Sequence, residues 1–210
     1  MALSLSKHTV GPLMENCYLL ADQSSGEAVL IDPGDEAKRL LGALRDASLT
    51  LKEIWLTHAH FDHIGALADI QDVLNVPVRM HPDDKEMYSY AAQAAQMWDI
   101  PFRQPTGSTQ DLSDNEILEF GGVSATCLFT PGHAPGHLAF YFPSEGYVIA
   151  GDALFKGSIG RTDLPMGNPT QLLESIKTRL LPLPDETVVY PGHGPETTIG
   201  VEKQTNPFLT

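Results

Sequence analysis

The sequence predicts an α/β fold, and two features of the chain support this prediction. Short apolar stretches typical of strands alternate with stretches whose apolar residues recur at helical spacing. The chain has 210 residues, of which 42% are hydrophobic and 19% are charged, so it can bury a sizeable core. We expect a single domain over residues 1–210, because no linker, repeat or low-complexity tract divides the chain.

The first half of the chain starts with a predicted hairpin and continues with alternating helices and strands. Gly26 closes the turn of the hairpin, whose strands are 16–22 and 28–31. Further strands are predicted at 54–56 and 76–80, and helices at 35–47, 64–74 and 82–97. In the last helix we assign one apolar stripe to the core: Met87, Tyr90, Ala91, Ala94 and Met97.

The second half is predicted to be richer in strands. Residues 101–114 contain many Pro, Gln, Ser and Thr residues and are predicted to form a loop. One helix is predicted over 170–180, and the expected strands are 117–120, 123–129, 138–142, 147–150 and 187–190.

Charge and cysteine content exclude several classes of protein. Thirteen Lys and Arg against 27 Asp and Glu give a formal charge of −14, which repels polyanions, so we expect no nucleic acid and no membrane as partner. Cys17 and Cys127 are too few for a disulfide framework. We find neither a signal peptide near the N-terminus nor an apolar window of membrane-spanning length, so we expect a cytoplasmic protein.

Histidines cluster in three short segments, each of which follows a predicted strand. The segment Thr-His-Ala-His-Phe-Asp-His places His58, His60, Asp62 and His63 in one loop. Pro-Gly-His-x-Pro occurs twice, around His133 and around His193, and Asp152 follows a fourth strand. His137 lies just beyond His133, where we expect it to support the site through a hydrogen bond.

These residue types point to a metal centre. Imidazole nitrogens and carboxylate oxygens suit Zn²⁺, Mn²⁺ or iron, and the near absence of cysteine argues against a structural zinc site. One metal needs three or four protein ligands, whereas seven candidates on four loops are about the number that two metals need. We expect two divalent ions, with zinc first and iron or manganese as alternatives.

The motifs resemble those of the metallo-β-lactamase fold superfamily, most closely its glyoxalase II-like hydrolases. His-x-His-x-Asp-His is present at positions 58–63, and the later histidine, aspartate and histidine of the family match His133, Asp152 and His193. The resemblance implies an αβ/βα four-layer sandwich of two mixed β-sheets flanked by helices. It assigns His58, His60 and His133 to one metal, Asp62, His63 and His193 to the second, and Asp152 to both.

The glyoxalase II-like branch implies a substrate and a mechanism. A hydroxide bridging the two metals would attack a thioester such as S-lactoylglutathione, and Asp62 would ligate and orient it as the catalytic residue. Arg161 occupies the place where these enzymes commonly carry a basic residue for glutathione, and Lys156 lies nearby, so both are expected to bind substrate. The sequence departs from the branch in having Asp163 and Pro195 at two aromatic positions, and in lacking its C-terminal helical glutathione-binding domain.

Two alternatives stay open from the sequence. The first is a mononuclear iron persulfide dioxygenase of the same fold, in which the positions of His58, His133 and Asp152 form a two-histidine, one-carboxylate triad. The second is a non-enzymatic module in which the metal is structural. A lactonase or β-lactam hydrolase shares the chemistry and would be a side activity.

Overall fold

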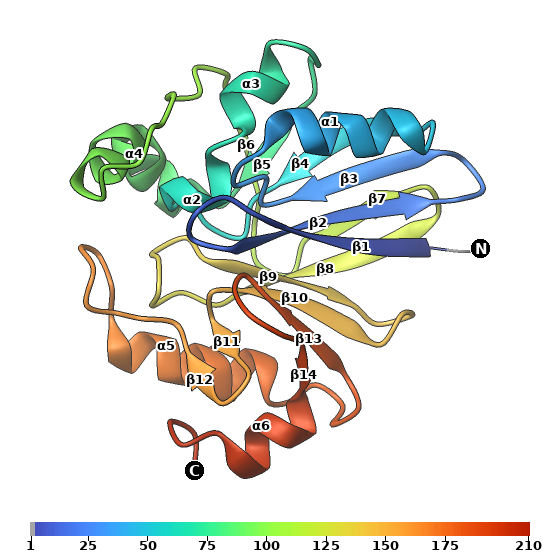
Figure 1. The fold of residues 1–210 in the computed structure, drawn as a ribbon. Coiled ribbons are helices and arrows are strands. Elements are labelled where there is room, and N and C mark those ends of the chain that lie inside the picture. The colour runs from blue at the N-terminus through green and yellow to red at the C-terminus, as the bar shows by residue number, and fades with distance from the viewer. Residues whose placement is uncertain (1–2) are drawn as a thin grey trace. The chain divides into compact units, whose positions relative to one another are not determined.

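Two six-stranded mixed β-sheets organise the chain in the computed structural model, which describes residues 3–210 (Figure 1). The chain divides into two compact units. The first runs to Asp111 and includes Glu119–Val123, and the second contains Leu112–Leu118 and Ser124–Thr210. The first unit holds one sheet and the second unit most of the other. The expectation of a single domain over 1–210 stays a prediction.

The first sheet combines an antiparallel meander with parallel strands. Its strand order follows the chain: β1 (Leu3–Val10), β2 (Glu15–Asp22), β3 (Glu27–Ile31), β4 (Thr50–Trp55), β5 (Val78–Met80) and β6 (Thr109–Asp111). The first two pairings are antiparallel and the last three are parallel. Because β3 and β4 are parallel neighbours, Asp32 directly after β3 and Thr57 two residues after β4 emerge at the same edge of the sheet.

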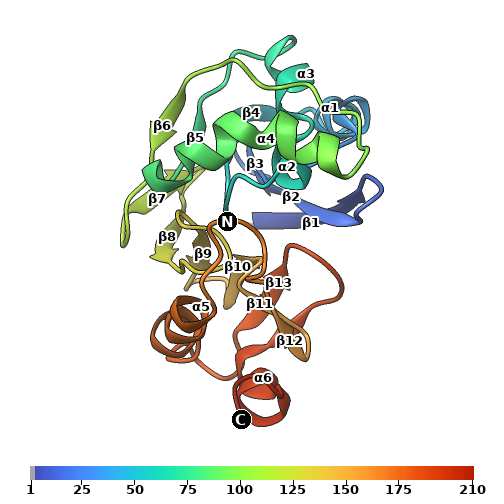
Figure 2. The ribbon, with the colours of Figure 1, turned by 90° about the vertical axis from the view of Figure 1, so that its left-hand side faces the viewer.

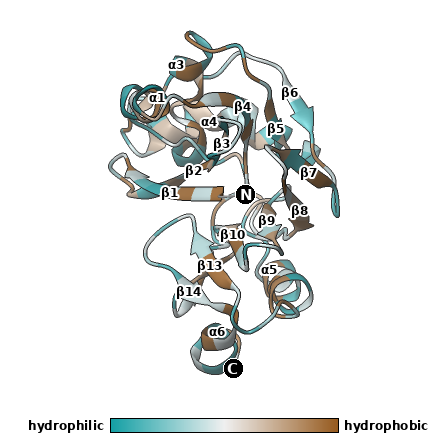
Figure 3. Cartoon of the chain, turned by 90° about the vertical axis from the view of Figure 1, so that its right-hand side faces the viewer, coloured by the Kyte–Doolittle hydropathy of each residue, from teal (hydrophilic) through white to brown (hydrophobic). Residues whose placement is uncertain are grey.

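Short helices connect these strands: α1 (Ala37–Asp46), α2 (Phe61–Ile64), α3 (Leu67–Gln71), the 3₁₀ turn η1 (Pro82–Asp84) and α4 (Lys85–Met97). In Figure 3, α1 carries both hydrophobic and hydrophilic residues, as its buried Leu40 and Leu44 require. The single helix predicted over 64–74 is wrong. The backbone N–H of Ala66 donates to the Pro33 carbonyl instead of continuing the helix, and the segment forms α2 and α3.

The apolar stripe assigned to the core of the third helix is only partly correct. Met87 and Ala91 are buried, but Tyr90 is 56% and Met97 is 86% exposed. The helix buries Tyr88 instead, so its inner face is rotated from the predicted one.

The second sheet has the order β14 (Thr197–Thr198), β13 (Val188–Pro191), β10 (Tyr147–Gly151), β9 (Leu138–Phe142), β8 (Val123–Phe129) and β7 (Ile117–Phe120). The helical segments α5 (Pro169–Ser175), the π-helical η2 (Ile176–Leu180) and α6 (Ile199–Thr205) follow in the same unit (Figures 1 and 2). Side chains from α5, η2 and α6, including Leu172, Ile176 and Ile199, pack with Val148 and Val189 of the sheet in one buried cluster.

Several elements differ from the sequence predictions. The predicted loop 101–114 contains the edge strand β6, which carries hydrophilic residues (Figure 3). The predicted helix 170–180 starts at Pro169 and ends in the π-helical turn η2. The short hairpin of β11 (Leu154–Phe155) and β12 (Ser158–Ile159) was not predicted, nor were β1, β14 and α6.

The expectations about membrane spans and disulfides can be compared with the structure. No helix among residues 3–210 is long and apolar enough to cross a membrane. Cys17 and Cys127 are both buried and form no disulfide, and burial raises the pKa of the Cys17 thiol well above its usual value. The cytoplasmic location stays a prediction.

Candidate metal centre

In the first unit, four predicted ligands gather where β4 ends and α2 begins. The ring centroids of His58 and His60 are 4.8 Å apart, and those of His58 and His63 are 4.0 Å apart. His58 and His63 are buried, whereas His60 and Asp62 are partly exposed. The prediction that all four lie in a loop is wrong in one respect, because Asp62 and His63 belong to α2. The helical turn places consecutive residues at different angles around its axis.

A buried aspartate and a threonine orient two of these rings. The Asp32 carboxylate accepts from the Thr57 backbone N–H at 2.7 Å and from the Thr57 hydroxyl at 2.6 Å. Because that hydroxyl donates to Asp32, its oxygen accepts from His58 Nδ1 at 3.0 Å. Asp32 Oδ2 also lies 3.1 Å from His63 Nδ1, which must donate to it. Both rings therefore carry their proton on Nδ1 and present Nε2 as the atom for a metal.

Asp32 was missed by the sequence analysis. The residue follows β3 directly, and its φ of 51° is a left-handed conformation that few non-glycine residues adopt. One ligand atom each of Asp32, His58 and His63 lies within 4.8 Å of the other two. The available signal was Asp-Pro-Gly at positions 32–34, directly after the predicted strand 28–31, and no site role was assigned to it.

The second unit brings together the other three predicted ligands, each at the end of a strand. His133 lies in the loop after β8, Asp152 follows β10, and His193 follows β13. Asp152 Oδ2 is 3.5 Å from His133 Nε2 and 3.7 Å from His193 Nε2. The Arg161 carbonyl accepts from His133 Nδ1 at 2.7 Å, so His133 also presents Nε2. The carboxylate of Asp152 thus stands between two imidazoles.

His137 contacts the backbone of a predicted ligand. The Asp152 N–H donates to His137 Nε2 at 3.0 Å, and His137 Nδ1 lies 2.8 Å from Thr130 Oγ1. Both ring nitrogens are hydrogen-bonded within the protein, as expected, and their role in supporting a metal site stays a prediction.

The two predicted substrate-binding residues lie near the β11–β12 hairpin. Lys156 is exposed at its turn. The Arg161 guanidinium makes two hydrogen bonds of 2.8 Å with the Asp163 carboxylate, and this pairing lowers the pKa of Asp163 to about 2. Asp163, which stands where the related enzymes have an aromatic residue, is therefore the ion-pair partner of Arg161. The substrate role of both cations stays a prediction.

A buried carboxylate that the sequence analysis did not identify holds this hairpin. Glu202 on α6 is completely buried and accepts from the Gly157 backbone N–H at 2.9 Å and from Thr197 Oγ1 at 2.6 Å. Asn206 donates to Glu202 at 2.7 Å and to the Ser158 carbonyl at 3.0 Å. No signal for Glu202 was available, because α6 itself was not predicted.

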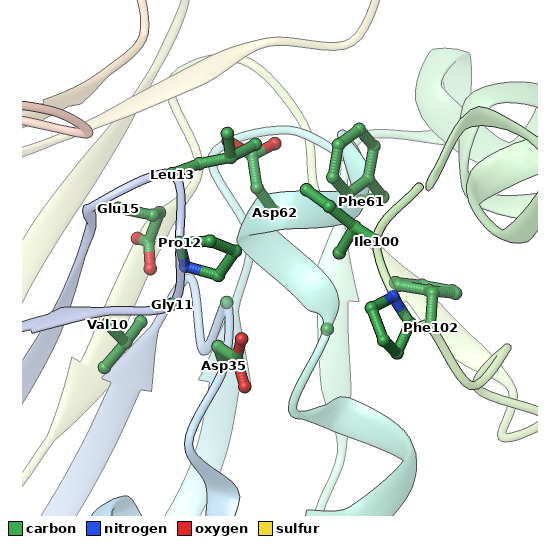
Figure 4. A pocket seen from close by; sticks show the side chains of 13 residues that line it. Val10, Gly11, Pro12, Leu13, Glu15, Asp35, Phe61, Asp62, Ile100 and Phe102 are labelled. Carbon is green, nitrogen blue, oxygen red and sulfur yellow. The ribbon is translucent and has the colours of Figure 1, made fainter. Parts of the chain in front are cut away.

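A pocket in the first unit opens beside Asp62 (Figure 4). The loop between β1 and β2 forms one side, and the segment Ile100–Phe102 forms another. Leu13 and Asp62 both line the pocket (Figure 4). The buried Glu15 also lines the pocket, with its Oε1 3.9 Å from His63 Nδ1.

The donor set fits divalent metal ions. It consists of imidazoles and carboxylates without any thiolate, and three of its histidines present the same nitrogen, Nε2, while Nδ1 is hydrogen-bonded within the protein. This is the arrangement that metal-binding histidines usually have. The residues thus suit a centre of zinc, manganese or iron.

Two curated relatives match nearly the whole chain. The probable metallo-hydrolase YqgX of Bacillus subtilis is 40% identical over 95% of this chain and 94% of its own. The hydroxyacylglutathione hydrolase GloC of Haemophilus influenzae is 38% identical over 95% of both chains.

Three solved structures share the fold. The BLEG-1 B3 metallo-β-lactamase is 39% identical with a TM-score of 0.92, covering 99% of this chain and all of its own. TTHA1623 in a di-iron-bound form is 46% identical with a TM-score of 0.90, covering 97% and 100%. ETHE1 from Myxococcus xanthus is 28% identical with a TM-score of 0.81, covering 97% and 83%.

These likenesses agree with the predicted fold of two mixed sheets flanked by helices. The family model described as the metallo-β-lactamase superfamily matches residues 10–193. Together with the His and Asp clusters, that family implies divalent metals. The chain therefore belongs to the metallo-β-lactamase superfamily of metallo-hydrolases.

Proposed function

We propose that this protein is a metal-dependent thioester hydrolase of the hydroxyacylglutathione type. The observation that carries the proposal is the 38% identity with GloC over 95% of both chains. The reaction adds the oxygen of water to the acyl carbon and breaks the carbon–sulfur bond, so a small-molecule thioester yields a carboxylic acid and a thiol.

The proposed metal ligands follow the family pattern. We assign His58, His60 and His133 to one ion, Asp62, His63 and His193 to the other, and Asp152 to both. The clustering of these side chains within each unit supports the assignment. Zinc is the metal we propose first, because imidazole and carboxylate together suit it and it needs no redox partner for hydrolysis.

Divalent ions at this centre would supply a water of lowered pKa and a Lewis acid for the carbonyl oxygen. Asp62, partly exposed at the start of α2, would accept a hydrogen bond from the attacking water and orient it. Lys156 and Arg161 would bind the anionic groups of a glutathione thioester. Asp163 would keep the Arg161 guanidinium in place until the substrate carboxylate competes for it.

The direct test is hydrolysis of S-lactoylglutathione by protein of measured metal content. We expect turnover that a chelator abolishes and that added Zn²⁺ restores. D62N should keep its fold and lose about 10²- to 10⁴-fold in kcat, which is the usual contribution of a group that manages the attacking water. Absence of hydrolysis by fully metallated protein would overturn the proposal.

An iron-dependent persulfide dioxygenase is the second candidate. The observation that motivates it is that TTHA1623, which is 46% identical to this chain, has a di-iron-bound form, so the shared fold accepts iron. Elemental analysis of protein purified without added metal separates the two candidates. About two zinc ions per chain supports the hydrolase, whereas one iron with oxygen uptake on glutathione persulfide supports the dioxygenase.

A β-lactam is the third substrate class to assay. The likeness to BLEG-1 favours it as a side activity, because amide and thioester cleavage need the same attack by activated water. We expect the kcat/KM for a β-lactam to lie well below that for the thioester.

A further inference from the structure

His137 is a buried histidine that none of the proposed metal positions uses. Its side chain is fully buried at the end of the loop 130–137 that carries His133. The loop is closed at its base by Thr130 and His137. The Thr130 backbone N–H donates to the His137 carbonyl at 2.9 Å, and their side chains meet at 2.8 Å.

The direction of each hydrogen bond around this ring can be assigned. A backbone N–H only donates, so His137 Nε2 must accept from Asp152 and carry no proton. The proton of the neutral ring then lies on Nδ1, which donates to Thr130 Oγ1. His137 is therefore in a defined tautomer that is unable to coordinate a metal without breaking one of these bonds.

The partner of His137 Nε2 is a peptide group that is held from both sides. The Asp152 N–H and the Gly151 carbonyl belong to the same peptide, and this carbonyl accepts from the Gly192 N–H at 2.8 Å. Gly192 precedes His193, and His137 closes the loop of His133. One peptide thus ties together the three loops of the second unit that carry His133, Asp152 and His193.

We propose that His137 is a positioning residue that sets the Gly151–Asp152 peptide, and through it aims the Asp152 carboxylate toward His133 and His193. The consequence for metal binding rests on the proposed metal centre. Loss of the Nε2 acceptor would leave a buried N–H without its partner, because Asp152 is only 7% exposed. The peptide would rotate toward another acceptor, and the carboxylate would move with it.

The tautomer can be measured on the unaltered protein. Nitrogen-15 NMR of the metal-free protein should show His137 with a protonated Nδ1 and an unprotonated Nε2, and hydrogen exchange should show a protected Asp152 amide. A proton on Nε2, or an Asp152 amide that exchanges at the rate of an exposed loop, would overturn the proposal. This measurement needs no variant that folds.

Two substitutions separate positioning from packing. H137Q retains an acceptor near the place of Nε2, whereas H137F fills the buried volume without one. We expect H137F to weaken Zn²⁺ binding by about 10- to 100-fold in a competition titration with a chromophoric chelator, which is the usual cost of losing a residue that orients a ligand. H137Q should stay within about threefold of the unaltered protein, and a shared loss in both variants would overturn the proposal.

Thr197 provides the matched control. T197V removes a buried threonine hydroxyl that donates to Glu202 in the same unit. We expect it to lower the unfolding free energy without changing Zn²⁺ affinity. The titration contains no thioester, so failure of the proposed thioester activity is distinguishable from failure of this inference. An unchanged Zn²⁺ affinity in a folded H137F protein would overturn the proposal that His137 is a positioning residue, whatever the substrate is.

Discussion

At the scale of single residues, the candidate centre is defined by which nitrogen each histidine presents. His58, His63 and His133 all use Nδ1 for a hydrogen bond within the protein, and their acceptors are a hydroxyl, a carboxylate and a backbone carbonyl. His137 uses both nitrogens and is thereby excluded as a ligand. Whether Nε2 already accepts a hydrogen bond within the protein, as it does in His137, therefore decides the role of the ring.

The first prediction concerns Asp32, which accepts from Thr57 and His63. D32N replaces one acceptor oxygen by an amide that donates, so at least one of these bonds must break. We expect Zn²⁺ affinity to fall about 10- to 100-fold and unfolding free energy by about 1–3 kcal/mol. Chelator competition and urea unfolding of the metal-free protein measure the two effects.

The control for D32N is D69N, since Asp69 is 65% exposed and pairs with Arg103 at the surface. Such pairs contribute about 0–1 kcal/mol, and D69N should leave Zn²⁺ affinity unchanged. Equal effects of the two substitutions would show that Asp32 does not orient the rings.

The second prediction concerns Asp22 at the end of β2. Hydrogen bonds from the Ser24 backbone N–H, the Ser24 hydroxyl and Ser25 lower the pKa of this carboxyl from 3.8 to about 2. Because the folded-state pKa is the lower one, the contribution of the carboxylate to stability is fully present above about pH 4 and is lost as the pH falls through about 2. D22N should be less stable than the unaltered protein at about pH 6, and the difference should shrink toward about pH 2.

Urea unfolding of metal-free protein across this pH range measures the effect, because metal release in acid would otherwise add its own pH dependence. D46N is the control, since Asp46 is an exposed residue at the end of α1 that pairs with its neighbour Arg45 at the surface. A stability difference between D22N and the unaltered protein that is constant with pH would contradict the assignment.

At the scale of elements, the sequence predicts strands and helices correctly where buried apolar residues recur at regular spacing. The strands 117–120, 123–129 and 138–142 agree with β7, β8 and β9 residue for residue. β6 was missed because Thr, Gln and Asp fill an edge strand whose pairing depends on β5, about 30 residues earlier in the chain. The break between α2 and α3 was missed because it depends on the hydrogen bond from Ala66 to Pro33.

The difference between local patterns and long-range contacts also decides which residues of the candidate site could be predicted. The seven donors could be named from the sequence because local motifs carry them. Asp32 and Glu202 were not named, because Asp32 contacts Thr57 and His63 at 25 and 31 residues' distance in the chain, and Glu202 contacts Gly157 at 45 residues' distance. Residues that orient a ligand are defined by tertiary contacts, which leave little trace in a single sequence.

The third prediction concerns the packing of α2 against the turn after β3. A Cβ atom on Gly34 would lie 1.8 Å from the Asp62 carbonyl oxygen and 2.5 Å from Glu15 Oε2. G34A must therefore displace α2 together with Asp62 and His63, and we expect it to cost about 1–3 kcal/mol in unfolding free energy. Elemental analysis should show reduced metal content.

Gly42 offers a contrasting glycine in the same unit. A Cβ atom there meets only Arg45 at 3.8 Å, so G42A in α1 should gain up to about 1 kcal/mol from helix propensity and keep its metal. Full metal content and unchanged stability in G34A would contradict the close packing of α2 on this turn.

At the scale of the whole molecule, the formal charge of −14 opposes the approach of an anionic substrate. Lys156 and Arg161 would attract it only locally, and Asp163 already pairs with Arg161. The proposed glutathione thioester would therefore approach against a repulsive field until it is near the hairpin. The family fold determines the metal chemistry, whereas this charge affects how quickly such a substrate arrives.

The last prediction follows from this field. Raising the ionic strength from about 0.01 M to about 0.15 M shortens the screening length from about 30 Å to about 8 Å. We therefore expect kcat/KM for S-lactoylglutathione to rise with salt, and kcat/KM for an uncharged acyl thioester to stay constant. In K156A the rise should be steeper, because one local attraction is removed. A fall with salt would contradict the prediction, since it would mean that the local cations outweigh the net charge of the molecule.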